Sequence, residues 1–185
     1  MNIFVGCSSR DVGNTAYNRA ADEIGSYIAR KGHTLVFGGC KEGLMGRVYS
    51  KVYGHGKVIC TQAKVYEEVE RATQSTEEEG KKSEVHISET INQRKDSFIQ
   101  MSDVLVFLPG GIGTVDEFFA SIESKRGGEH NNPMIIVNVD GYFDPMLAVL
   151  ERTYSEGLAS PETKKLYHIA NSVEEAILAL EVIEK

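Results

Sequence analysis

Short apolar runs alternate along the chain with segments in which apolar residues recur every three or four positions. The runs predict strands, and the periodic segments between them predict amphipathic helices. We predict strands at residues 2–7, 33–37, 57–61, 85–87, 103–108, 134–139 and 167–170. We predict helices at residues 17–28, 43–53, 89–101, 115–122 and 142–154, and a last helix that Ser172 and Glu175 open as a capping box.

This alternation indicates the fold class. Nearly continuous apolar strands that are separated by helices are typical of a parallel sheet with both faces covered. We therefore expect an α/β, Rossmann-like three-layer fold, with a mostly parallel sheet between two layers of helices. A length of 185 residues predicts a single domain over residues 1–185. In such a sheet ligands bind beyond the carboxyl ends of the strands, near the topological switch point.

Composition and charge argue against several classes of protein. The formal net charge of −7 disfavours a protein that coats nucleic acid. No apolar run approaches the roughly 18 residues that suggest a membrane span, and the first residues do not resemble a signal peptide. Three cysteines without a C-x-x-C pair indicate neither a disulfide framework nor a zinc site. We expect buried free thiols and a reducing, cytoplasmic location.

Residues 65–84 differ from the rest of the chain. They contain seven Glu against one Arg and two Lys. This composition predicts a solvated helix followed by a mobile connection. Whether the segment is a lid, a dimer contact or disordered is left open.

The strongest chemical signal follows the strand predicted at residues 103–108. There the chain reads P-G-G-I-G-T-V-D-E, and a helix is predicted next. Glycines allow close backbone approach to a ligand, and the first amides of a helix attract an anion. Gly110, Gly111, Gly113 and Thr114 are therefore candidate phosphate-binding residues. The pattern is neither a Walker A sequence nor the dinucleotide G-x-G-x-x-G.

A purely structural interpretation of this segment stays open. The glycines could simply turn the chain, and Thr114 with Glu117 fits a capping box. The helix dipole would favour an ionised Glu117, which suits a carboxylate role better than a proton donor.

Arg94 and Lys95 fall on or beside the predicted inward face of their helix. A buried cation is costly unless an anion meets it, so Glu117 or a bound nucleotide is the candidate partner of Arg94. Alternatively, the two stems cover apolar surface while the charged heads reach water. Gly39 and Ser8 follow two other predicted strands and could contact a ligand, although tight turns explain them equally well.

The chain resembles the LONELY GUY (LOG) family, whose members often carry a lysine decarboxylase label. The run from Pro109 to Glu117 is similar to the family signature P-G-G-x-G-T-x-x-E, and Arg94-Lys95 matches the R-K of its second motif. The glycine turns at 37–39 and 43–46 and the N-V-D-G-Y run at 138–142 extend the resemblance over most of the chain. Residues before Arg94, Cys40 in the glycine turn and the segment 60–88 depart from the family pattern. No feature suggests a pyridoxal phosphate lysine.

The resemblance implies a Rossmann-like homodimer that hydrolyses the N-glycosidic bond of a nucleoside 5′-monophosphate, such as a cytokinin riboside monophosphate or AMP. Glu117 and Arg94 would be catalytic, and the glycine turn would hold the phosphate with support from Lys95. Neither a metal nor another cofactor is expected. A nucleotide-binding sensor or carrier without turnover and a base-exchanging transferase remain alternatives, and the base itself stays undetermined.

Overall fold

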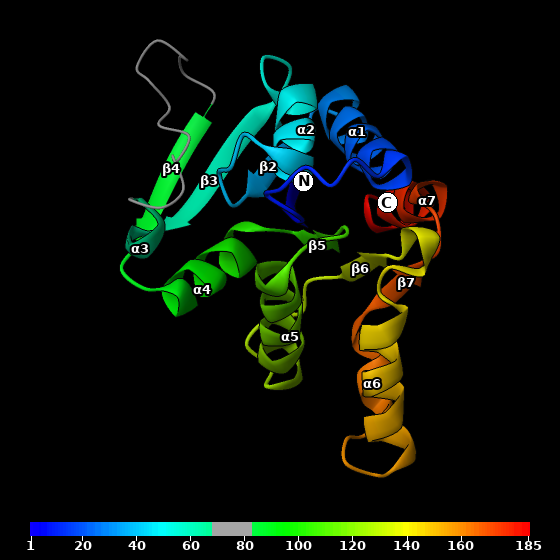
Figure 1. Ribbon diagram of the computed structural model, residues 1–185. Helices are drawn as coiled ribbons and strands as arrows, with labels where there is room; N and C mark the ends of the chain where they lie inside the picture. Colours follow the sequence, from blue (N-terminus) through cyan, green and yellow to red (C-terminus); the bar gives the residue numbers. More distant parts are fainter. Residues whose placement is uncertain (68–82) are drawn as a thin grey trace.

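The protein contains a seven-stranded sheet with strand order β4-β3-β2-β1-β5-β6-β7, and every pairing is parallel (Figure 1). The structure is a computed structural model that describes residues 1–67 and 83–185. The strands are β1 (Asn2–Gly6), β2 (Thr34–Phe37), β3 (Lys57–Ala63), β4 (Ser83–Ser88), β5 (Val104–Phe107), β6 (Met134–Val137) and β7 (His168–Ala170).

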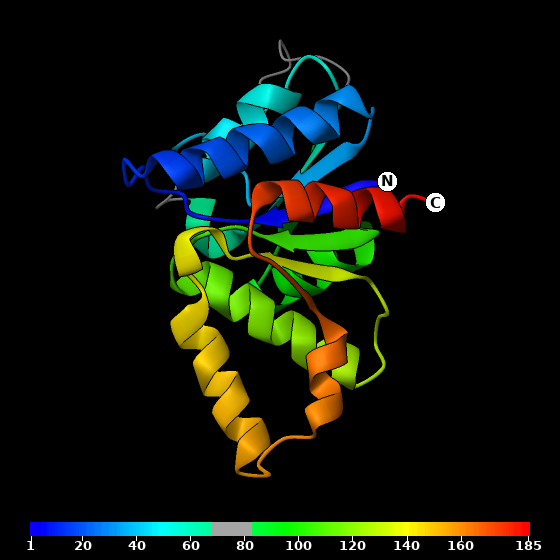
Figure 2. The same ribbon diagram turned by 90° about the vertical axis from the view of Figure 1, so that its right-hand side faces the viewer.

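Helices cover both faces of this sheet. One face holds α1, α2 and α7, and the other holds α4, α5 and α6 (Figures 1 and 2). The helices are α1 (Thr15–Arg30), α2 (Gly43–Val52), α3 (Lys64–Glu67), α4 (Ile91–Met101), α5 (Ile112–Arg126), α6 (Asp144–Ser155) and α7 (Val173–Ile183), with 3-10 turns η2 (Val139–Gly141) and η3 (Pro161–Leu166). The predicted α/β, Rossmann-like class with a parallel sheet is confirmed.

Alternation along the strands produces two separate cores. In β1, Ile3 and Val5 pack into one apolar cluster with α1, α2 and α7, whereas Phe4 packs into the other with α4 and α5. Successive strand side chains point to opposite faces, so a strand that is covered on both sides is apolar at every position. This accounts for the unbroken apolar runs in the sequence.

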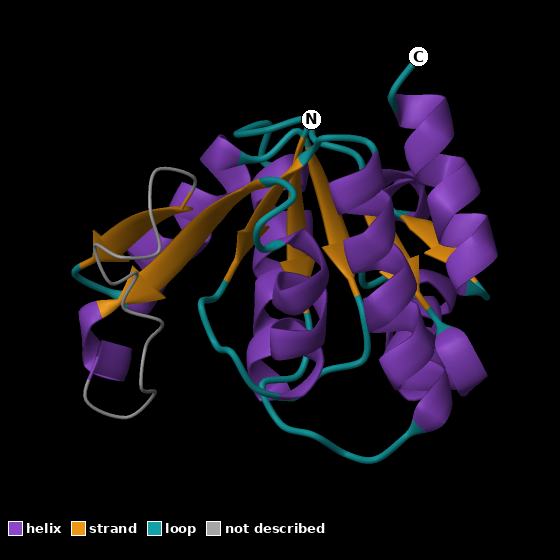
Figure 3. Ribbon diagram, turned by 90° about the horizontal axis from the view of Figure 1, so that it is seen from above, coloured by secondary structure: helices purple, strands orange, loops and turns teal. Residues whose placement is uncertain are grey.

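The chain order places a topological switch point at the centre of the sheet. From β1 the chain passes outward through β2, β3 and β4, and it then returns to form β5 on the other side of β1. The loops after β1 and β5 are tied together, because the Ser8 amide donates to the Pro109 carbonyl at 3.1 Å. Figure 3 shows the central strands running in the same direction, so that their carboxyl ends lie at one edge of the sheet. A ligand crevice is therefore expected at the carboxyl ends of β1 and β5.

Most predicted bounds differ from the observed ones by a few residues, and one of these differences has a clear structural cause. The predicted strand 134–139 ends at Val137, and the helix predicted from residue 142 starts at Asp144. The Asn138 side chain causes this break, since it accepts from the Phe143 amide and donates to the Asp144 carboxylate. Most of the predicted solvated helix within residues 65–84 lies outside the described residues.

Two remaining expectations concern the cysteines and membrane spans. Cys7 and Cys60 are buried thiols, whereas Cys40 is only half-buried. None of the helices within the described ranges has the length and apolar character needed to cross a membrane.

Candidate active site

The N-terminus of α5 faces the switch point without a side-chain cap. Gly111 is the N-cap residue, and the helix begins at Ile112. The capping-box interpretation of Thr114 with Glu117 is therefore wrong, because Thr114 lies within the first turn and its side chain packs against Gly110. The first amides of a helix have no acceptor inside the helix, and they form the positive end of its dipole. This end of α5 can therefore accept an anion.

A cleft of about 480 Å³ lies in front of this helix end. Its walls come from the ends of β1 and β2 and from α2, α4 and α5. It is lined by Cys7, Ser8, Ser9, Arg10, Gly38, Met45, Arg94, Gly111, Ile112, Gly113, Thr114 and Glu117. The volume lies within the range of about 300–1,000 Å³ that is typical of small-molecule sites.

A buried ion pair forms the floor of the cleft. Arg94 Nη2 donates to Glu117 Oε1 at 2.9 Å, and Arg94 Nε donates to the Thr61 carbonyl at 3.0 Å. Only 9% of Arg94 and 3% of Glu117 is exposed. Burial raises the pKa of Glu117 above its ordinary value, and the Arg94 guanidinium acts in the opposite direction. The pair holds the carboxylate in a fixed orientation.

The second oxygen of Glu117 is distinctive. Oε2 is buried and has no hydrogen-bond partner among the described residues. Buried polar atoms are normally paired, so an unpaired oxygen on a residue that lines a cleft indicates a place for a ligand or a water molecule. Glu117 therefore carries one buried acceptor that no described residue occupies.

Two glycines at strand ends make room for the ion pair, because neither has a side chain. A Cβ atom on Gly6 would lie 3.0 Å from Glu117 Oε2, and one on Gly38 would lie 2.8 Å from Arg94 Nη2. Both distances are shorter than an ordinary contact between a methyl group and a nitrogen or oxygen atom. The sequence contained these glycines in its strand-end turns, but their spacing could not assign them to the ion pair.

The other predicted site residues divide into two groups. Ser8, Gly111, Gly113 and Thr114 line the cleft, whereas Lys95 and Gly39 do not. The ammonium group of Lys95 donates to both carboxylate oxygens of Asp116 at 3.0 Å. A Cβ atom on Gly39 would meet the side chains of Cys60 and Gln62 at 2.3 and 2.5 Å. Gly39 is thus packed against β3.

Gly110, the remaining predicted glycine, does not line the cleft that contains the ion pair. It lines a smaller lobe that adjoins the cleft, and its carbonyl accepts a hydrogen bond from the Tyr142 hydroxyl. This bond ties the glycine turn to the segment after β6. Tyr142, Arg10, Cys7 and Met45 were not assigned to the site from the sequence. The sequence indicated them only in so far as each lies in or next to a motif that follows a predicted strand.

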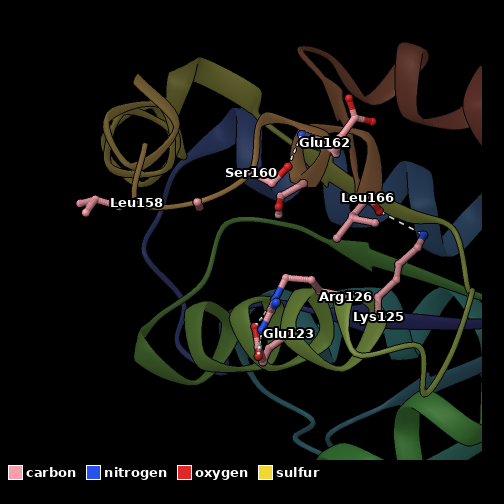
Figure 4. A pocket seen from close by; sticks show the side chains of 9 residues that line it. Glu123, Lys125, Arg126, Leu158, Ser160, Glu162 and Leu166 are labelled. Atoms are coloured by element: carbon pink, nitrogen blue, oxygen red, sulfur yellow. Dashed lines mark hydrogen bonds and ion pairs between the residues drawn. The ribbon is translucent and has the colours of Figure 1, made fainter. Parts of the chain in front are cut away.

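A larger cleft of about 700 Å³ lies elsewhere, between the C-terminal end of α5 and η3 (Figure 4). Its cations already have partners. Lys125 donates to the Leu166 carbonyl at 3.1 Å, and Arg126 pairs with Glu123. The Lys125 bond holds η3 against α5, and no unpaired buried polar atom of the described part of the chain lines this cleft.

No group of three or more His, Cys, Asp or Glu side chains within residues 1–67 and 83–185 is placed to hold a metal ion.

Comparison with known proteins identifies the family. The family model described as "Possible lysine decarboxylase" matches residues 45–180. The chain belongs to this family. It is the LONELY GUY family that the P-G-G-x-G-T-x-x-E signature predicted. A relative from Rhodococcoides fascians, named cytokinin riboside 5′-monophosphate phosphoribohydrolase, is 30% identical over 97% of this chain and 88% of its own length. A rice relative of the same activity name, LOG from Oryza sativa subsp. japonica, is 31% identical over 97% of this chain and 72% of its own.

Solved structures share the LONELY GUY fold of this chain. The molybdenum cofactor binding protein from Rippkaea orientalis has a TM-score of 0.67 and 18% identity, and the match covers 100% of this chain and 96% of that one. This likeness shows a common architecture.

Proposed function

We propose that this family member hydrolyses the N-glycosidic bond of a nucleoside 5′-monophosphate, and that AMP or a cytokinin riboside monophosphate is its substrate. The single observation that supports this most strongly is that Glu117 lines the cleft and that its buried Oε2 has no hydrogen-bond partner among the described residues. Relatives at 30–31% identity carry the name of this activity.

The phosphate is the first group to be placed. It binds at the amides of Gly111, Gly113 and Thr114, where the uncapped start of α5 supplies positive potential. Ser8 also lines the cleft, where its hydroxyl group donates to the Arg10 carbonyl and fixes the loop beside the phosphate. Lys95 is not part of this site, because its ammonium group is bound to Asp116.

The ribose then lies over the ion pair. Glycosidic bond cleavage develops positive charge at C1′, and a carboxylate close to that carbon stabilises it. Glu117 Oε2 accepts a hydrogen bond from the attacking water and takes its proton as the water oxygen bonds to C1′. The bond between C1′ and the base nitrogen breaks, and its electron pair leaves with the base. The base gains a proton from solvent, so the products are free base and ribose 5-phosphate.

Arg94 acts on this reaction through position and charge. It holds Glu117 Oε1, which leaves Oε2 for the attacking water, and its charge offsets negative charge on the departing base. The raised pKa of Glu117, which results from burial, makes its carboxylate a stronger base than an exposed glutamate.

A substrate panel tests the proposal. The protein is incubated with AMP, isopentenyladenine riboside monophosphate and pyrimidine nucleoside monophosphates, and free base is measured by chromatography. We expect base release by the wild type and its loss in Glu117→Ala. Glu123→Gln, two turns further along α5 and exposed, is the matched control. Tight AMP binding without base release would instead indicate a carrier or sensor, and base exchange with a labelled acceptor would indicate a transferase.

Two further properties remain proposals. The homodimer that the family resemblance implies is tested by light scattering coupled to gel filtration. The cytoplasmic location that cysteine usage predicts is tested by fractionation of cells that express the protein.

A further inference from the structure

A second, smaller lobe opens beside the cleft on the other side of the glycine turn. Its volume is about 220 Å³. The residues that only this lobe contacts are Val12, Tyr17, Leu44, Pro109, Gly110 and Tyr142. Ser8, Arg10 and Gly111 line both spaces, so the lobe and the cleft adjoin at the start of α5, where the phosphate is proposed to bind.

The lobe is suited to a ring. Its walls are largely apolar, and the Tyr17 and Tyr142 rings meet there edge to face with their centroids 5.5 Å apart. Tyr142 is held in place by its hydrogen bond to the Gly110 carbonyl. Aromatic side chains of this kind bind nucleobases and other flat rings by stacking and edge contacts.

Arg10 lies where the cleft and the lobe meet. Its backbone is fixed, because Ser8 Oγ accepts from the Arg10 amide at 3.0 Å and donates to the Arg10 carbonyl at 2.9 Å. No carboxylate among the described residues pairs with Arg10, whereas Arg94 is already bound to Glu117. Arg10 is thus the cation of the shared wall that is available to an anionic ligand.

We propose that this lobe binds a ring-bearing group that is esterified to the phosphate of the bound nucleotide. The inference rests on the proposed function for the position of the nucleoside. A ligand that fills both spaces must have its anionic group between them, beside Arg10 and the α5 amides. A phosphomonoester occupies only the cleft, whereas a nucleoside phosphodiester occupies the cleft and the lobe.

The test compares two ligands by calorimetry at one salt concentration: AMP and adenosine 5′-(phenyl phosphate). The phenyl ester has less negative charge than AMP, so without the lobe it binds more weakly at an anion site. We expect it to bind about tenfold tighter than AMP to the wild type. In Val12→Trp, where the indole occupies part of the lobe, the preference for the ester is lost and AMP binds at least as tightly as the ester. Val149→Trp on α6 keeps the wild-type ratio, since Val149 is similarly exposed, at 61% against 57% for Val12, and lies outside the lobe.

Two results would overturn the inference: a phenyl ester that binds no tighter than AMP, and a wild-type ratio in Val12→Trp. Adenine release from AMP is measured on the same samples. Adenine release without preference for the ester would contradict the proposed role of the lobe and support the proposed function. Preference for the ester without adenine release would contradict the proposed function and support the proposed role of the lobe. Failure of both ligands to bind contradicts both.

Discussion

Glu117 is bound to Arg94 through one carboxylate oxygen only. Oε1 lies 2.9 Å from Arg94 Nη2, while Oε2 is buried without a hydrogen-bond partner among the described residues. An ion pair that served only to stabilise the fold would be expected to satisfy both oxygens, because each unpaired buried acceptor is unfavourable. The arrangement therefore combines a fixed carboxylate with one acceptor that is left for a ligand.

Removal of Arg94 should destabilise the protein. In Arg94→Met, Glu117 is a buried carboxylate without its counter-ion, and loss of one partner of such a pair typically costs about 3–5 kcal/mol. Arg94→Met with Glu117→Leu removes both charges and should recover most of that loss. Urea denaturation measures the free energy of unfolding of each variant. A double variant that is as unstable as Arg94→Met would contradict this description of the pair.

The acidic limb of the pH–rate profile should report Glu117. Activity rises as the carboxyl group loses its proton, and burial places this limb above the ordinary glutamate pKa of about 4.3. Because Arg94 lowers the Glu117 pKa, Arg94→Met should move the limb to still higher pH. The measurement is kcat/KM from pH 4.5 to 8. An unchanged limb in that variant would show that another group titrates.

Gly6 should be required for activity. A methyl group at this position would lie 3.0 Å from Glu117 Oε2 and 3.1 Å from the buried rings of Phe4 and Phe107, so the carboxylate is displaced and some stability is lost as well. We expect Gly6→Ala to lose at least about tenfold in kcat, which corresponds to about 1.4 kcal/mol of transition-state stabilisation. Gly127→Ala is the control, because a Cβ atom there makes ordinary contacts of 3.4 Å. Equal activity of the two variants would exclude the steric explanation.

The Tyr142 hydroxyl should support phosphate binding through Gly110. Tyr142→Phe keeps the ring and loses one hydrogen bond, which is worth about 0.5–1.5 kcal/mol. We expect KM for AMP to rise by about two- to tenfold while kcat changes little. Tyr154→Phe removes a hydroxyl whose hydrogen-bond partner among the described residues is Tyr167; neither residue lines the cleft, so KM should be unchanged. A fall in kcat alone for Tyr142→Phe would mean that the hydroxyl acts on the chemical step.

The sequence predicted the parallel sheet because its strands are buried on both faces, and β1 shows this at every position from Ile3 to Val5. It also indicated Glu117 as a partner of Arg94, since a cation on the inward face of a helix requires an anion. The pattern of apolar residues was less informative where the hydrogen bonds of a polar side chain determine where a strand ends and a helix begins. Asn138 ends β6 and delays α6 through bonds that apolar periodicity does not report.

The sequence could not predict which of two neighbouring residues faces the site. Arg94 and Lys95 are neighbours with the same charge, yet Arg94 binds Glu117 inside the protein and Lys95 binds Asp116 at its surface. The difference comes from the helix rotation of about 100° between consecutive residues and from the exact facing of α4 and α5. The same holds for Gly38 and Gly39, of which the first faces Arg94 and the second faces β3.

The most direct test of the central claim is kcat for AMP hydrolysis by Glu117→Gln, measured together with the AMP dissociation constant. The amide keeps the size of the side chain and loses the charge and the basic oxygen. The account predicts a fall of at least about a hundredfold in kcat, with AMP affinity close to that of the wild type. A variant that releases adenine within a few fold of the wild-type rate would contradict it.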